Sequence, residues 1–143
     1  MAEKIAIASD HAGFEMKTQL KQELAALGFE PLDLGTDGPA SVDYPDFAAK
    51  MAAALKSGAV SRGVLVCGSG IGISMAANRH PHVRAALCHD HLTAKLCRLH
   101  NDANVLCLGG RTTGSDVAKD CLRVFLETEF EGGRHQNRVA KFS

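Results

Sequence analysis

The feature that most constrains this chain is a regular alternation of short apolar runs with longer segments of helical spacing. Five runs of four or five mostly apolar residues have the length and composition of buried strands. They cover residues 5–8, 31–34, 63–67, 84–88 and 104–108. Short buried strands separated by helices are typical of a sheet with helices on both faces.

Helical patterns occupy the intervals between these runs. An apolar face marks the first helix, and its members are Met16, Leu20, Leu24 and Leu27. Further helices are predicted around residues 47–55, 71–77, 90–101 and 115–128. Strands that alternate with helices pair in parallel through right-handed crossovers. The sequence therefore predicts one α/β domain over residues 1–143, a three-layer, Rossmann-like α/β/α sandwich with a five-stranded parallel sheet. The polar tail 129–143 is interpreted as a short excursion rather than another strand.

Composition and charge exclude several classes of protein. Lys+Arg and Asp+Glu both number 16, so no excess of charge points to nucleic acid or to a membrane surface. The first residues lead directly into a strand without the layout of a signal peptide, and no apolar run approaches the ~20 residues of a membrane helix. The cysteines number five and show no CxxC spacing, which argues against a disulfide framework or a zinc knuckle. We expect a cytoplasmic protein with reduced thiols.

The residues that follow each predicted strand mark the place to look for a function. In open parallel sheets, ligands bind beyond the carboxyl ends of the strands. Polar residues and glycines stand there, at positions 9–11, 35–37, 67–70, 89–90 and 109–111. We therefore expect the functional site at this edge of the sheet.

The segment Cys67-Gly68-Ser69-Gly70-Ile71-Gly72 has the composition of an anion-binding loop. Its glycines let backbone N–H groups turn toward a ligand at the start of a helix. It lacks the lysine of a P-loop, the arginine of a cysteine phosphatase loop and the last glycine of a dinucleotide fingerprint. The ligand is either a phosphate or a developing enediolate, and the alternative is a tight turn that binds nothing.

Cys67 opens that loop, where the dipoles of a helix start favour a thiolate. It is either a nucleophile or general base, or a buried structural cysteine. The structural interpretation is preferred for the other cysteines, which are Cys88, Cys97, Cys107 and Cys121.

Three further groups carry weaker signals. Asp10 and His11 follow the first strand and could bind a sugar hydroxyl and a phosphate, although Asp10 could equally cap a helix. The HxH pairs at residues 80–82 and 89–91 could bind zinc, but surface imidazoles are the favoured interpretation of His80, His82, His89 and His91. Residues 132–138 contain two arginines and a histidine without any acid, which suits either a phosphate site or a solvated basic tail.

Together, these motifs resemble those of the ribose-5-phosphate isomerase B family, which includes relatives that act on allose and galactose phosphates. The matching segments occur in order along nearly the whole chain. They are SDHAG at 9–13, DYPDFA at 43–48, CGSGIGISMAAN at 67–78, HNDANV at 100–105, GR at 110–111 and EGGRH at 131–135. One family branch has a glutamate where Ile73 stands, so this chain resembles the cysteine branch.

The resemblance implies a role for each site residue. Cys67 would take the C2 proton, and His100 would open the sugar ring. Ser69 would bind the enediolate together with backbone N–H groups of Gly68, Gly70, Ile71 and Gly72. Asp10 and Asn101 would bind sugar hydroxyls. The phosphate would be held by His11, Arg111, Arg134 and Arg138. No metal and no organic cofactor would be needed.

The expected activity is the interconversion of ribose 5-phosphate and ribulose 5-phosphate, a reaction of the pentose phosphate pathway. Three alternatives stay open. They are an isomerase of allose 6-phosphate or galactose 6-phosphate, a non-catalytic sugar-phosphate-binding module, and a subunit that needs a different partner chain. Residues 35–43 are a candidate loop for selecting substrate size.

The positions of Cys67 and His100 predict an oligomer. Cys67 ends its strand, whereas His100 precedes the fifth strand and should lie at the opposite edge of the sheet. We therefore expect a homodimer, or a higher homo-oligomer, whose active sites are shared. In this interpretation a neighbouring subunit supplies His100, Asn101 and Arg111.

Overall fold

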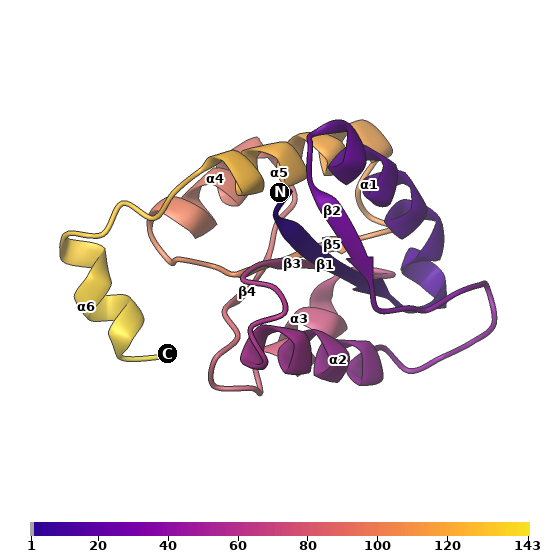
Figure 1. Ribbon diagram of the computed structural model, residues 1–143, viewed down its shortest axis with the longest axis horizontal. Helices are drawn as coiled ribbons and strands as arrows, with labels where there is room; N and C mark the ends of the chain where they lie inside the picture. Colours follow the sequence, from indigo (N-terminus) through magenta and orange to yellow (C-terminus); the bar gives the residue numbers. More distant parts are fainter. Residues whose placement is uncertain (1) are drawn as a thin grey trace.

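Five parallel strands form the centre of the structure, a computed structural model that describes residues 2–143 (Figure 1). The strands are β1 (Lys4–Ser9), β2 (Glu30–Asp33), β3 (Gly63–Cys67), β4 (Ala85–Leu87) and β5 (Val105–Gly109). The helices are α1 (Phe14–Ala26), α2 (Tyr44–Lys56), α3 (Ile71–Ala77), α4 (His91–Leu99), α5 (Ser115–Glu127) and α6 (Arg134–Ala140). A short 3-10 helix, η1 (His11–Gly13), precedes α1. The predicted fold class and the five predicted strands are confirmed, with ends that differ by one residue.

The order of the strands adds what periodicity could not supply. It is β2-β1-β3-β5-β4, and every neighbouring pair is parallel. After β1 the chain forms β2 on one side and then returns to place β3 on the other side. Ligands of open α/β sheets bind at such a switch point, outside the carboxyl ends of the strands. The fold therefore directs attention to the ends of β1 and β3.

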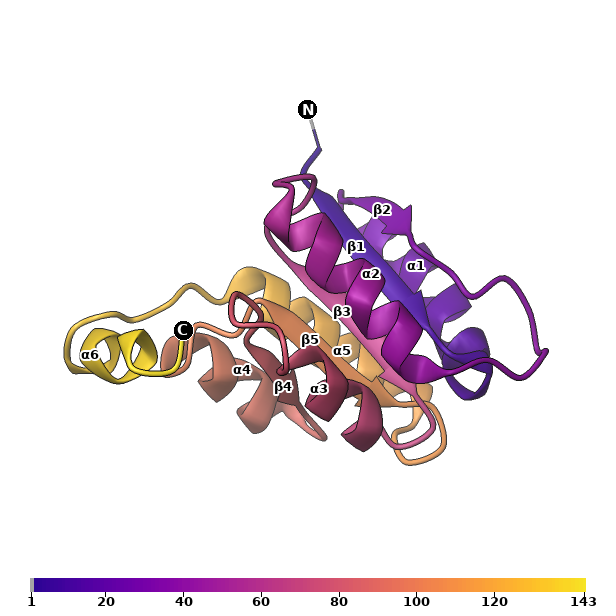
Figure 2. The same ribbon diagram turned by 90° about the horizontal axis from the view of Figure 1, so that it is seen from below.

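Helices cover both faces of the sheet, as the two perpendicular views show (Figures 1 and 2). On one face, α1, α4 and α5 pack over a core that includes Met16, Leu20 and Leu24 from the predicted apolar face of α1. On the other face, α2 and α3 pack through Phe47, Met51 and Ile73. The two cores hold the strands in place, and the ends of the strands are left for the loops.

The tail of the chain contains a helix that the sequence reading did not predict. Helix α6 lies apart from the three layers (Figure 1). Its connection to α5 is fixed by the Glu131 N–H, which donates to the Leu99 carbonyl at 3.1 Å. The helix buries only His135 and Val139. With seven residues after Gly132-Gly133 and a single buried aliphatic side chain, it offers no periodic pattern to recognise.

Within residues 2–143, no helix is both long enough and apolar enough to cross a bilayer.

Candidate active site

A cleft of about 1020 Å³ opens where β1 and β3 end side by side. Its walls are the loops after β1, β3 and β5 together with residues 41–46. The lining includes Asp10, His11, Cys67, Gly68, Ser69, Ile71, Gly72 and Arg111, all predicted from the sequence, and also Asp43, Tyr44 and Thr112. The prediction that the site lies at the carboxyl edge therefore agrees with the cavity found there.

Backbone hydrogen bonds join the three strand-end loops to one another. The Asp10 N–H donates to Val66 O at 3.2 Å, so the loop after β1 is tied to β3. The Gly110 N–H donates to Cys67 O and the Arg111 N–H to Gly68 O, both at 2.8 Å. These hydrogen bonds join the backbone of the three loops into one unit, which holds the Cα positions of the residues that line the cleft.

Cys67 lines the cleft at the end of β3 and is only 4% exposed. The Gly70 N–H donates to its Sγ at 3.2 Å, and a donor aimed at the sulfur is the partner that a thiolate needs. Gly70 has a φ of 77°, and a Cβ there would lie 2.6 Å from Leu87 Cδ1 and 2.9 Å from the Leu108 carbonyl carbon. Gly70 was predicted to bind substrate, but it does not line the cleft, and its N–H donates to the sulfur instead.

Ser69 and Gly72 shape the mouth of the same loop. Ser69 Oγ accepts a hydrogen bond from the Ile71 N–H at 3.2 Å, so the hydroxyl proton stays available to a ligand. A Cβ at Gly72 would lie 2.5 Å from Cζ of Tyr44, which means that the Tyr44 ring packs directly over this glycine. No role was predicted for Tyr44, although an aromatic residue directly before the proline of a helix start is a usable signal.

Asp10 and His11 combine structural and ligand-facing roles. Asp10 Oδ1 accepts from the Gly13 N–H at 3.0 Å, so this carboxylate does cap η1 while it also lines the cleft. His11 Nδ1 accepts from the Val42 N–H at 3.2 Å. A nitrogen that accepts carries no proton, so the neutral ring must carry its proton on Nε2. His11 therefore offers a donor of the kind that an anionic oxygen binds.

A buried lysine anchors the segment that orients His11. Lys17 is 1% exposed, and its Nζ lies 2.7 Å from Asp33 Oδ1 and also donates to the Thr36 carbonyl. Burial acts to raise the pKa of Asp33, but Lys17 and Lys21 outweigh it and hold that pKa below its ordinary value. Asp33 therefore stays ionised and fixes the start of the loop that carries Val42. Of the candidate size-selecting loop 35–43, residues 41–43 line the cleft.

Arg111 belongs to the same cleft as Cys67. A Cβ at Gly68 would lie 3.3 Å from Arg111 Nη1, so the guanidinium passes alongside the loop. Because Cys67 pairs in register with Gly109, Arg111 emerges at the same edge of the sheet. The expectation that a neighbouring subunit supplies Arg111 is therefore wrong, since this residue follows β5 rather than preceding it.

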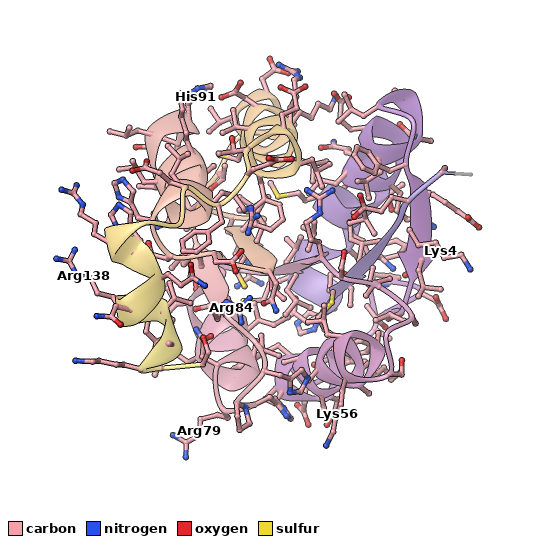
Figure 3. The ribbon with its side chains drawn as sticks, turned by 60° about the vertical axis from the view of Figure 1, so that its left-hand side comes forward. Lys4, Lys56, Arg79, Arg84, His91 and Arg138 are labelled. Carbon is pink, nitrogen blue, oxygen red and sulfur yellow. The ribbon has the colours of Figure 1, made fainter. Side chains whose placement is uncertain are left out.

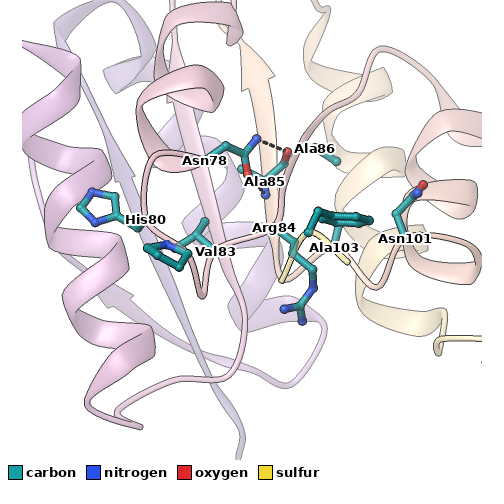
Figure 4. Close-up of a pocket in the computed structure, with 10 residues that line it drawn as sticks. Asn78, His80, Val83, Arg84, Ala85, Ala86, Asn101 and Ala103 are labelled. Atoms are coloured by element: carbon teal, nitrogen blue, oxygen red, sulfur yellow. Dashed lines mark hydrogen bonds between the residues drawn. The ribbon is translucent and has the colours of Figure 1, made fainter. Parts of the chain in front are cut away.

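Four other predicted residues lie elsewhere. His100 follows α4 and precedes β5, so it stands at the amino edge of the sheet. The five residues of β5 alone span ~16 Å. Asn101 lines a separate cavity of about 420 Å³ beside β4, and His80 lines the same cavity (Figure 4). Arg134 and Arg138 line a hollow on α6, and Arg138 projects outward from that helix (Figure 3).

Within residues 2–143, one histidine of each HxH pair binds a separate partner. His82 Nε2 lies 2.7 Å from Ala52 O, and His91 pairs with Asp120 at 3.0 Å, so neither HxH pair converges on one point. Among residues 2–143, the group whose metal-type donor atoms come together is His100, Glu131 and His135. The four other thiols are buried as predicted. Burial raises the pKa of Cys121 to about 11 and raises that of Cys107 further.

Fold and cleft together define a class: an open α/β protein with a cleft at the switch point of its sheet, lined by a thiol, an arginine and a glycine-rich loop. Comparison with known proteins identifies the family. The family model for ribose/galactose isomerases matches residues 5–142. The chain therefore belongs to the ribose/galactose isomerase family.

Individual relatives cover nearly the whole chain. Ribose-5-phosphate isomerase B of Escherichia coli is 43% identical over 136 residues, which are 95% of this chain and 91% of that protein. The solved ribose-5-phosphate isomerase B of Clostridium thermocellum is 50% identical with a TM-score of 0.95, covering 96% of this chain and 93% of its own. The solved enzyme of Thermotoga maritima is 47% identical with a TM-score of 0.96, covering 99% and 98%.

Proposed function

We propose that this chain is an aldose–ketose isomerase that interconverts ribose 5-phosphate and ribulose 5-phosphate. The observation that carries the proposal is the placement of Cys67 in the cleft, with a backbone donor on its sulfur and Ser69, Asp10 and Arg111 around the same space. The relatives named ribose-5-phosphate isomerase B support the same substrate. The pentose phosphate pathway and the cytoplasm are the setting that this reaction implies.

The proton transfer uses groups that line the cleft. The Cys67 thiolate takes the proton from C2, and the electron pair moves through C1 to O1, which gives an enediolate. O1 gains a proton and O2 loses one, after which the thiol returns its proton to C1. The developing negative charge is stabilised by the Ser69 hydroxyl and by the N–H groups of Gly68 and Gly72, which line the cleft. In comparable sites, the loss of one such donor costs ~2.7–4 kcal/mol.

The phosphate and the sugar hydroxyls fix the substrate for that transfer. Arg111 and the Nε2–H of His11 lie in the cleft and can bind phosphate oxygens. Asp10 accepts hydrogen bonds from hydroxyls with the carboxylate oxygen that η1 leaves free. Because phosphate binding orients the reacting carbons, these contacts contribute to turnover as well as to affinity.

Ring opening requires a second acid–base group. The anomeric hydroxyl loses a proton, the bond from C1 to the ring oxygen breaks, and that oxygen gains a proton. His100 is the group that the family resemblance assigns to this step, but it stands at the far edge of the sheet from Cys67. We therefore propose a homodimer in which each cleft receives His100, Asn101, Arg134 and Arg138 from the partner chain.

The test compares turnover of ribose 5-phosphate, allose 6-phosphate and galactose 6-phosphate by the purified chain. Ribose 5-phosphate is expected to be turned over best, and activity is expected to persist after EDTA treatment because no step is assigned to a metal. Preference for a hexose phosphate would move the chain to another branch of its family. Binding without turnover would make it a sugar-phosphate-binding module, and activity regained only with zinc would contradict the metal-free mechanism.

A further inference from the structure

The imidazole ring of His135 stacks on that of His100. The ring centroids are 4.3 Å apart and the ring planes differ by 17°. His135 is 5% exposed, although its neighbours Arg134 and Gln136 on α6 are exposed. A histidine buried against the proposed ring-opening residue has no role in the mechanism described so far.

Backbone contacts hold both rings in place. The His100 N–H donates to Leu96 O at 2.9 Å, which keeps this residue on the last turn of α4. The following turn is fixed at Asp102, which has a φ of 49° and binds Arg98 at 2.9 Å. On the other side, the Glu131 N–H donates to Leu99 O and so brings the start of α6 against the end of α4. The stack is therefore a consequence of how the tail is attached.

A metal ion is the first alternative explanation for this cluster. His100, Glu131 and His135 offer donor atoms that lie within 4.8 Å of one another. Ligand atoms of a tetrahedral zinc ion, with bonds of ~2.0–2.1 Å, stand only ~3.4 Å apart. In addition, a nitrogen lone pair lies in the plane of its imidazole ring. Because the planes of His100 and His135 are nearly parallel, their lone pairs do not converge on one ion. The geometry favours a contact between rings over a shared ligand.

The surroundings of His135 disfavour the charged form of its ring. Its Nε2 is buried and has no hydrogen-bond partner within residues 2–143; the Glu131 carboxylate lies 3.6 Å away. Burial, and then the neighbouring His100, lower the pKa of His135. A neutral ring face against His100 can stabilise an imidazolium there, whereas two adjacent imidazolium rings would repel each other.

We propose that His135 is a positioning residue for ring opening: it holds the His100 ring by stacking and leaves His100 as the ring of the pair that gains and loses the proton. This role rests on the proposed isomerase function. It predicts that loss of the His135 ring impairs ring opening and leaves the enediolate step intact.

Two assays separate those steps. Ribulose 5-phosphate cannot close a five-membered ring, because its O5 is esterified, so deuterium exchange from D₂O into its C1 position reports proton transfer alone. Conversion of ribose 5-phosphate requires ring opening as well. The conversion of ribose 5-phosphate is measured at high enzyme concentration. Under these conditions, spontaneous ring opening limits the rate of a variant that cannot open the ring itself.

The variants are His135→Ala, which removes the ring, and His135→Phe, which keeps a flat ring of similar size without a titrating nitrogen. His135→Ala is expected to lose about tenfold in conversion of ribose 5-phosphate, which is a part of the ~10²–10⁴ that a positioned acid–base group contributes. Its exchange rate should stay within about twofold of wild type, and His135→Phe should regain most of the lost conversion. His91→Ala, which removes an exposed imidazole from the other end of α4, is the matched control and should leave both rates unchanged.

Several outcomes would overturn the proposal. Equal losses in both assays would make His135 a support for the phosphate-binding arginines, and unchanged rates would leave the stack without a role. A selective defect in His135→Phe as large as that in His135→Ala would show that stacking is not the property required; His135→Phe also decides the question if His135→Ala does not fold. A wild-type chain inactive in both assays would reject the isomerase function itself.

Discussion

The two edges of the sheet differ in how firmly they hold their functional groups. At the carboxyl edge, Cys67, Gly68 and Arg111 belong to loops that are hydrogen-bonded to one another, and glycines there lie against neighbouring backbone. At the amino edge, Asn101, Arg134 and Arg138 are exposed, and α6 stands apart from the layers (Figure 1). One edge is a complete cleft, whereas at the other edge the side chains of Asn101, Arg134 and Arg138 have no hydrogen-bond partner among residues 2–143.

In the proposed mechanism, this difference corresponds to a division of the chemistry between the two edges of the sheet. Proton abstraction needs a base held within a fraction of an ångström, and the interlocked loops provide that. Arginines that close over a phosphate can be delivered on a separate helix, provided that the helix belongs to a neighbouring copy. The predictions below test this division, beginning with the largest expected effect.

Cys67→Ala should lower kcat by ~10²–10⁴-fold, the contribution of a general base. The phosphate is bound by other residues, so calorimetry should still detect a phosphate-bearing inhibitor with nearly unchanged affinity. Cys121→Ala, which removes another buried thiol, is the control and should keep the wild-type kcat. Wild-type turnover in Cys67→Ala would show that Cys67 is not the base.

Replacing one glycine at each edge by alanine compares the packing of the two edges directly. Gly70→Ala adds a methyl group at a φ of 77° and within 3 Å of Leu87 and Leu108. The left-handed strain of ~1–2 kcal/mol and the overpacking of ~1–3 kcal/mol together should lower the free energy of unfolding by about 2–5 kcal/mol. Gly132 has a similar φ of 72° but nothing within 4 Å, so Gly132→Ala should cost only the ~1–2 kcal/mol of strain. Equal losses in urea denaturation would contradict the contrast.

Arg138→Ala should raise KM roughly 10- to 150-fold, since a charge-assisted contact is worth ~1.5–3 kcal/mol. Steady-state kinetics on ribose 5-phosphate provide the measurement, and a smaller loss of kcat is expected alongside. Arg123→Ala, which removes an arginine of similar exposure from α5, should leave both constants unchanged. If Arg138→Ala behaves like that control, the α6 arginines are a solvated surface.

Sequence patterns predicted the parts of this molecule that depend on local repetition. The apolar spacing of Met16, Leu20 and Leu24 predicted α1, and the glycines after Cys67 predicted the tight turn between β3 and α3. Strand order could not be predicted, because parallel pairing depends on contacts between distant segments. The proximity of Tyr44 to Gly72 and the stacking of His135 on His100 depend on the same kind of contact. Arg111 follows β5 and therefore lies at the carboxyl edge with Cys67, whereas His100 precedes β5.

The last prediction tests whether the two edges meet across a dimer. Cys67→Ala and His100→Ala chains are each expected to be nearly inactive, and they are mixed under conditions that allow subunits to exchange. In a random mixture half of the dimers are mixed, and each mixed dimer has one site with both lesions and one with neither. About a quarter of all sites should then recover on the closed-dimer model. Arg111 provides the internal control, because it lies in the same cleft as Cys67: Cys67→Ala mixed with Arg111→Ala should show no recovery at low substrate concentration. If both residues act within one chain, every site keeps a lesion, so the absence of recovery despite proven exchange would rule out the shared site.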